Sequence, residues 1–182
     1  LLIFHPVTEE VDNVEIYFEN ILKNLEEKQI KTFVSYPNVD YGNEKLVQVI
    51  EKYKRNENFI FYKNLNRDIF LSIYKQAKFI IGNSSSGICE AATFRIPAIN
   101  VGLRQTGRYA DRNVIFSGTS YSDIKNALNQ ALSKKFKDEI KDVNNSYGDG
   151  LSAVKALKVI KTIDFQKMIA KVEDPLESEL YE

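Results

Sequence analysis

The sequence has little of several residue types, and each shortage excludes a class of protein. A single cysteine among 182 residues rules out an internal disulfide framework and argues against a structural zinc site. Lys plus Arg and Asp plus Glu number 25 each, so no net charge attracts nucleic acid or a membrane surface. Apolar runs are too short to span a bilayer, and we expect no signal peptide. We expect a cytoplasmic protein without a metal, a cofactor, a nucleic-acid partner or a membrane partner.

The rest of the composition is typical of a globular domain. Hydrophobic residues make up 43% and charged residues 27% of a chain long enough for one domain with its own core. The chain begins abruptly with the apolar segment Leu1-Leu2-Ile3-Phe4 and has no initiator methionine. We therefore expect it to be a piece of a longer protein.

Short apolar segments alternate with segments that have helical periodicity. Strands are predicted at residues 1–4, 31–36, 59–62, 79–81, 98–101 and 114–116. Helices are predicted at 12–27, 43–53, 67–77, 87–94, 120–133 and 151–163. This alternation is typical of an α/β fold in which helices cover both faces of a parallel sheet. We predict one domain over 1–163 and a tail over 164–182 that is extended or disordered.

Polar loops follow the first five predicted strands. The segments are 5–6, 36–40, 64–67, 83–86 and 102–108. Ligands of parallel α/β sheets bind beyond the carboxyl ends of the strands, where these loops meet. The loops therefore predict a ligand site at this edge of the sheet.

The most informative loop is Gly82-Asn83-Ser84-Ser85-Ser86-Gly87, here called the serine turn. Its backbone N–H groups and three hydroxyls at the start of a helix suit a phosphate or diphosphate. Glu90 follows one turn later and would accept hydrogen bonds from ribose hydroxyls. The alternative is a serine-rich helix N-cap without a ligand, in which the serines satisfy the first N–H groups of the helix.

Three further groups of side chains are candidates at this edge. His5 titrates near neutral pH and is able to move a proton, or it caps the strand. Arg104 and Arg108 neutralise a diphosphate or support the serine turn, or they are surface residues. Asn38 and Asp40 bind sugar hydroxyls, or they form an Asx turn.

Several of these motifs together resemble one known family. They are Gly82-Asn83-Ser84-Ser85-Ser86-Gly87 with Glu90, Pro97-Ala98-Ile99-Asn100, Arg104-Gln105-x-Gly107-Arg108 and Tyr147-Gly148-Asp149-Gly150. In this order they resemble the C-terminal half of UDP-N-acetylglucosamine 2-epimerases, over roughly residues 1–163. Tyr36-Pro37-Asn38-x-Asp40 and the Arg-Gln-x-Gly-Arg stretch resemble the hydrolysing, sialic-acid branch, and His5-Pro6-Val7-Thr8 resembles the opening of the same half.

The resemblance implies a glycosyltransferase-B-like fold of two Rossmann-like domains, of which this chain is the second. It implies a UDP-sugar substrate, a missing N-terminal domain and a homo-oligomeric full-length enzyme that eliminates UDP to form 2-acetamidoglucal and then adds water. The chain alone is expected to be inactive. The roles implied by the resemblance are diphosphate binding for Ser84, Ser85 and Ser86, ribose binding for Glu90, uracil contact for Phe70, and active-site roles for His5 and Arg104. Gly87 of the serine turn and Arg108 are further candidates for the UDP site.

One departure and three alternatives accompany the resemblance. The non-hydrolysing branch has two glycines at the positions of Ser85 and Ser86 and an acidic pair at Cys89-Glu90, which favours the hydrolysing branch. The alternatives are an epimerase of another UDP-sugar, such as a bacillosamine derivative, a glycosyltransferase of similar fold, and a non-catalytic UDP-binding module.

Overall fold

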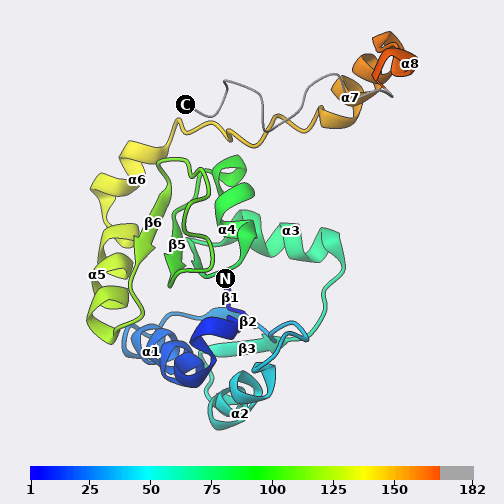
Figure 1. Cartoon of the computed structure of the whole chain (residues 1–182). Helices are drawn as coiled ribbons and strands as arrows, with labels where there is room; N and C mark the ends of the chain where they lie inside the picture. The colour runs from blue at the N-terminus through cyan, green and yellow to red at the C-terminus, as the bar shows by residue number, and fades with distance from the viewer. Residues whose placement is uncertain (169–182) are drawn as a thin grey trace, which may run out of the picture. The chain divides into compact units, whose positions relative to one another are not determined.

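The computed structural model describes residues 1–168. A first compact unit comprises Leu1–Tyr147, and a second unit begins at Gly148. The first unit is built on a six-stranded sheet with the order β3-β2-β1-β4-β5-β6, and every pair is parallel (Figure 1). The strands are β1 (Leu2–Ile3), β2 (Thr32–Ser35), β3 (Phe59–Tyr62), β4 (Ile80–Gly82), β5 (Ala98–Val101) and β6 (Val114–Ser117). The predicted parallel α/β sheet is confirmed, with the strand order of a doubly wound dinucleotide-binding fold.

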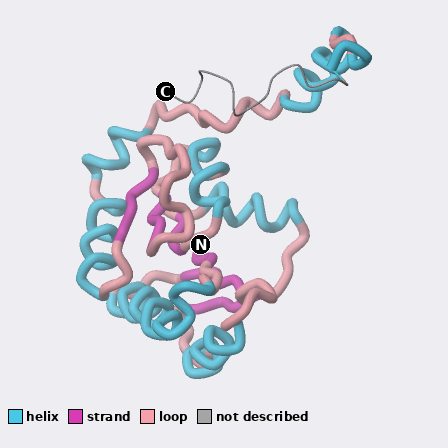
Figure 2. The backbone as a smooth tube through the Cα atoms, in the orientation of Figure 1, coloured by secondary structure: helices cyan, strands magenta, loops and turns pink. Residues whose placement is uncertain are grey.

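Helices cover both faces of this sheet (Figure 2). The helices are α1 (Val14–Glu27), α2 (Asn43–Tyr53), α3 (Arg67–Gln76), α4 (Ser85–Cys89), α5 (Tyr121–Leu132) and α6 (Lys134–Ile140). The larger apolar cluster joins the sheet to α1, α2, α5 and α6, and the smaller one joins it to α3. Leu2 belongs to the first cluster and Ile3 to the second, because successive side chains of a strand point to opposite faces.

Helix boundaries differ from the prediction at three places. A 3₁₀ helix, η1 (Thr8–Asn13), precedes α1, which therefore starts at Val14. The helix predicted at 87–94 starts at Ser85 and is interrupted at Glu90, after which η2 (Ala91–Phe94) follows. Helix α6 was not predicted, because it is short and buries only Phe136 and Ile140.

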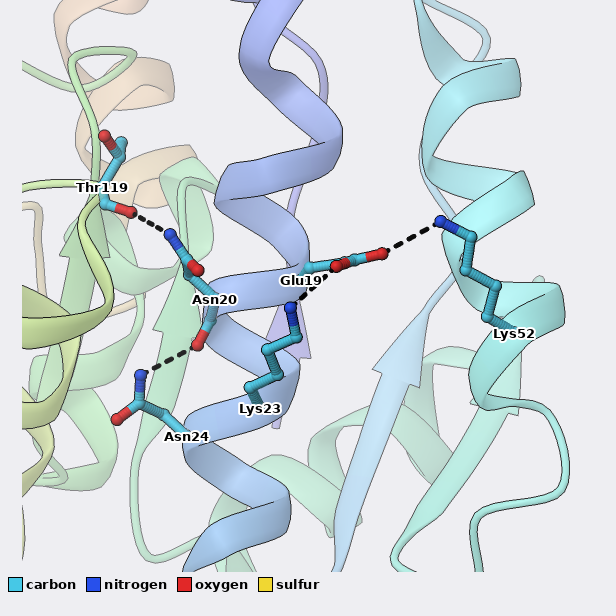
Figure 3. A network of polar contacts seen from close by, with 6 residues as sticks. All are labelled: Glu19, Asn20, Lys23, Asn24, Lys52 and Thr119. Carbon is cyan, nitrogen blue, oxygen red and sulfur yellow. Dashed lines mark hydrogen bonds and ion pairs between the residues drawn. The ribbon is translucent and has the colours of Figure 1, made fainter.

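Buried amides connect α1 to the second half of the sheet (Figure 3). The Asn20 side chain donates to the carbonyl of Thr119 at 3.1 Å. The amide of Asn24, only 1% exposed, donates to the carbonyls of Asn20 at 2.9 Å and Tyr121 at 3.1 Å. The bonds to Thr119 and Tyr121 cross from α1 to the segment that begins α5, so they fix the two helices against each other.

Ion pairs connect α1 to α2 on the solvent side of the same network (Figure 3). Glu19 accepts from Lys23 and from Lys52, each at 3.0 Å. Exposed ion pairs contribute only about 0–1 kcal/mol. The contact between α1 and α2 is therefore stabilised chiefly by the buried apolar residues between them.

The second unit contains α7 (Ser152–Thr162), within the predicted helix 151–163, and α8 (Phe165–Met168). Every side chain of α7 is exposed. Helix α8 shows that the predicted tail begins with a helical turn, and the remainder of that prediction, residues 169–182, lies outside the described residues. The domain boundary after Ile163 stays a prediction. No helix within residues 1–168 has both the length and the apolar character needed to cross a membrane.

Candidate functional site

The carboxyl edge of the sheet gathers the polar loops that the sequence analysis singled out. Ile3 of β1 is in register with Gly82 of β4, so the residues that follow these two strands are neighbours. Gly82 has φ of +130°, and a Cβ there would lie 2.0 Å from the carbonyl oxygen of Ile3. Only glycine allows the chain to turn this close to β1 and enter the serine turn.

Asn83 connects three of these loops. Its Oδ1 accepts from the His5 backbone N–H and its Nδ2 donates to the His5 carbonyl, both at 2.8 Å. Its own carbonyl accepts from Arg104 Nη1 at 3.1 Å and from Gln105 Nε2 at 2.9 Å. Asn83 and Gln105 are 1% and 2% exposed. The role of Asn83 was not predicted, because only the structure shows that its amide is buried and which loops it joins.

The serine turn is an N-cap that retains free donors. Ser84 Oγ accepts from the Ser86 N–H at 3.3 Å, and the Ser84 carbonyl accepts from the Gly87 N–H at 3.1 Å. Ser86 Oγ donates to Glu90 Oε2 at 3.0 Å. Within residues 1–168, neither the N–H nor the hydroxyl of Ser85 has a partner. The N-cap alternative is thus correct for Ser84, while Ser85 keeps two donors available.

Helix α4 has only five residues, so its macrodipole is small. Attraction of an anion to the serine turn therefore depends on individual donors: the Ser85 N–H and hydroxyl and the Ser84 hydroxyl proton. This differs from the expectation of a longer helix over 87–94. Of the three expected hydroxyls, those of Ser84 and Ser85 keep their protons available, whereas the Ser86 hydroxyl donates to Glu90.

An aromatic group supports the turn from the sheet side. The hydroxyl of Tyr74, fully buried, donates to the Ser86 carbonyl at 2.9 Å. Burial raises the pKa of Tyr74 well above its ordinary value, so this hydroxyl remains a donor. Phe70, half-buried on the first turn of α3, stacks on Tyr74 with centroids 5.6 Å apart. Phe70 therefore packs on the core and keeps part of its ring accessible, beside the residue that supports Ser86 and Glu90.

His5 belongs to the loop after β1 and lies close to the loops after β2 and β5. Its Nδ1 accepts from the Asn38 backbone N–H at 3.2 Å. Burial lowers the pKa of His5, the positive charge of Arg104 lowers it further, and Asp40 opposes both effects. The Asn38 side chain in turn donates to the Asp40 carboxylate. Four predicted site residues, His5, Asn38, Asp40 and Arg104, are thus together.

The two arginines differ in their surroundings. Both are exposed. Arg104 donates to the carbonyl of Asn83 and so supports the serine turn, which was one of the two functional roles expected for it. Arg108 forms no ion pair with any other residue in the range 1–168. The structure therefore brings Arg104 to the site and leaves the role of Arg108 a prediction.

One further hollow of the described residues lies away from this site, and a metal-binding cluster is not found among residues 1–168. Among residues 1–168, no three His, Cys, Asp or Glu side chains are arranged to hold a metal ion. A hollow of about 800 Å³ lies at the opposite edge, lined by Thr32, Phe33 and Phe79 among others. Ligands of parallel sheets bind at the carboxyl edge, so we place the candidate site at the serine turn.

The fold and this edge define the class of the chain as a doubly wound α/β domain whose candidate site lies beyond the ends of β1, β2, β4 and β5. Comparison with known proteins then gives the family. The model of the UDP-N-acetylglucosamine 2-epimerase family matches residues 1–161, and the chain belongs to that family.

Curated relatives and solved structures agree with this assignment. The chain is 35% identical over 169 residues to UDP-N,N'-diacetylbacillosamine 2-epimerase (hydrolyzing) of Legionella pneumophila, covering 93% of this chain and 44% of that protein. It is 37% identical over 130 residues to UDP-N-acetylglucosamine 2-epimerase of Neisseria meningitidis, covering 71% and 34%. The chain therefore spans less than half the length of these relatives.

A crystal structure shows the same fold at low sequence identity. The Neisseria meningitidis UDP-GlcNAc 2-epimerase bound to UDP-GlcNAc has a TM-score of 0.73 at 12% identity, over 89% of this chain and 44% of that one. The Methanocaldococcus jannaschii enzyme in complex with UDP-GlcNAc and UDP has a TM-score of 0.65 at 20% identity, over 88% and 44%. The predicted resemblance and its Rossmann-like, glycosyltransferase-B-like fold are confirmed.

Proposed function

We propose that this chain is the UDP-binding half of a hydrolysing UDP-sugar 2-epimerase. The observation that carries the proposal is the pair of free donors on Ser85 beside Glu90, in a chain of this family. In the proposed reaction, UDP leaves C1 as a proton is removed from C2, and water adds to the resulting 2-acetamidoglucal to give N-acetylmannosamine.

The nucleotide contacts follow from the distribution of donors and acceptors. Ser85 and the Ser84 hydroxyl donate to the diphosphate, whereas the Ser86 hydroxyl is already used by Glu90. Glu90 Oε1, which accepts no bond from residues 1–168, receives a ribose hydroxyl. The exposed part of Phe70 contacts the uracil, and Arg104 adds positive charge near the leaving group.

The remainder of the proposal concerns the full-length enzyme. A preceding domain closes the cleft and supplies the carboxylates of the reaction, Asn38 and Asp40 contact the sugar, and the enzyme is a homo-oligomer. The chain covers 44% or less of the length of four curated relatives, which supports the additional domain. Measurable turnover by the present chain alone would contradict this division. The cytoplasmic location stays a prediction.

Two UDP-sugars are candidate substrates. UDP-N-acetylglucosamine was expected from the sequence and is named for a relative that is 37% identical over 130 residues. UDP-N,N'-diacetylbacillosamine is named for a hydrolysing relative that is 35% identical over 169 residues. The test incubates the full-length protein with each sugar and follows products by NMR. Release of UDP together with a free sugar whose configuration at C2 is inverted supports the proposal. Transfer of the sugar to an acceptor without inversion, or UDP binding without any turnover, supports the glycosyltransferase or the binding module instead.

The diphosphate site is tested by calorimetry of UDP binding to the full-length protein. Ser85→Asp places a carboxylate among the donors and should abolish measurable binding by repulsion and loss of the hydroxyl. Ser122→Asp, at an exposed position in the first turn of α5, adds the same charge outside the serine turn and is the matched control. Unchanged affinity in Ser85→Asp would exclude the serine turn as the diphosphate site.

A further inference from the structure

The ring of His5 is held by a group that can only donate. The Asn38 backbone N–H lies 3.2 Å from Nδ1. A backbone amide nitrogen has no acceptor capacity, so Nδ1 must accept and carries no proton. The neutral imidazole then has its proton on Nε2.

The same ring is restrained through its backbone. Asn83 bonds to both the N–H and the carbonyl of His5 at 2.8 Å. His5 is thus fixed from β4 on its main chain and from the loop after β2 on its ring. With Nδ1 occupied, Nε2 is the ring nitrogen left to act on a ligand.

We propose that the Asn38 amide is a positioning group that locks His5 as the Nε2–H tautomer, so that His5 acts as a neutral hydrogen-bond donor and not as a base. Given the function proposed above, the acceptor is the diphosphate oxygen that gains charge during elimination. The C1–O bond breaks, a base outside this chain takes the C2 proton, and the C–H electron pair becomes the C1–C2 double bond. UDP leaves with the C1–O electron pair, and His5 Nε2–H stabilises that charge without losing its proton.

The surroundings of His5 keep it neutral. Among the described residues, Arg104 from the loop after β5 and Asp40 from the loop after β2 are the charged groups that act on its pKa. Burial and Arg104 lower the pKa and outweigh Asp40. Protonation of Nδ1 would also break the bond from Asn38. A neutral donor beside an arginine suits a developing oxyanion, because both groups present hydrogen to it.

The tautomer is directly measurable because His5 is the only histidine of the chain. In the chain labelled with ¹⁵N-histidine, the chemical shifts of the two ring nitrogens distinguish the protonated from the unprotonated one. We expect an unprotonated Nδ1 and a protonated Nε2 at neutral pH, in the native chain and in Asn38→Ala, which retains the backbone donor. Asn38→Pro removes only that N–H from the backbone and should give a mixture of tautomers. A protonated Nδ1 in the native chain overturns the proposal, whether or not the proline variant folds. If Asn38→Pro folds and its His5 tautomer is unchanged, the positioning role of Asn38 is overturned.

The donor role is tested by kinetics of the full-length enzyme. His5→Gln places an amide N–H near the position of Nε2–H but cannot act as a base, whereas His5→Leu has neither property. His5→Leu should lower kcat about 10²–10³-fold, the usual effect of removing one donor to a developing oxyanion. His5→Gln should retain at least about 10-fold more activity than His5→Leu, the effect of one hydrogen bond to a charged group. Equal losses in both variants overturn the donor role. An inactive native enzyme with the expected tautomer would refute the proposed function and leave the tautomer assignment standing.

Discussion

Replacement of Asn83 by alanine tests whether the edge of the sheet depends on one buried amide. The variant removes the two 2.8 Å bonds to His5 and leaves a buried N–H and carbonyl without partners. Each net hydrogen bond contributes about 0.5–1.5 kcal/mol, so the free energy of unfolding should fall by about 1–3 kcal/mol. The bonds from Arg104 and Gln105 should survive, because they reach the backbone carbonyl of Asn83.

Denaturant titration of this chain measures the loss, and thermal unfolding should show a decrease in Tm of roughly 2–12 °C, at about 2–4 °C per kcal/mol. Asn64→Ala, at an exposed loop position, is the matched control and should change the free energy of unfolding by less than about 0.5 kcal/mol. In the full-length enzyme, Asn83→Ala should also reduce kcat, because His5 is no longer fixed. A loss as small as that of the control would show that the two bonds are not needed and would refute the reasoning.

Three further predictions concern single residues of the same edge. Glu90→Gln should weaken binding of UDP more than binding of pyrophosphate in calorimetry, since its proposed partner is the ribose; equal weakening of both ligands would exclude that role. Because folding lowers the pKa of His5 below its ordinary 6.5, the unfolded chain binds more protons, and the free energy of unfolding should fall as the pH decreases from neutral toward about 5. The decrease in the free energy of unfolding with falling pH should be smaller in His5→Gln than in the native chain. The same dependence on pH in both proteins would contradict this prediction. Gly82→Ala should destabilise the chain by at least about 2 kcal/mol, because the new Cβ meets the Ile3 carbonyl, whereas Gly107→Ala has open space and only backbone strain of about 1 kcal/mol.

The sheet was predictable from the sequence because each strand is a short apolar segment bounded by polar or turn residues. The site was predictable as a set of loops, since the carboxyl ends of parallel strands share one edge. The hydrogen-bond network centred on Asn83 was not predictable. Its partners His5 and Gln105 are 78 and 22 residues away in sequence, and only the strand register brings them together. The interruption of α4 at Glu90 escaped prediction because the segment 87–94 contains no proline and its composition suits one continuous helix.

The strand order allows the chain to be divided into two fragments that each carry half of the sheet. Strands β3, β2 and β1 come from residues 1–62 and β4, β5 and β6 from residues 80–117, so each half of the sheet is contiguous in sequence. The pairing of β1 with β4 and the amides of α1 in Figure 3 join the halves, and a cut in the exposed loop at Asn64 would separate them. His5 belongs to one fragment and Asn83 with the serine turn to the other. The two bonds between His5 and Asn83 would form only on complementation, so the tautomer and pKa of the His5 ring would report the meeting of the two fragments.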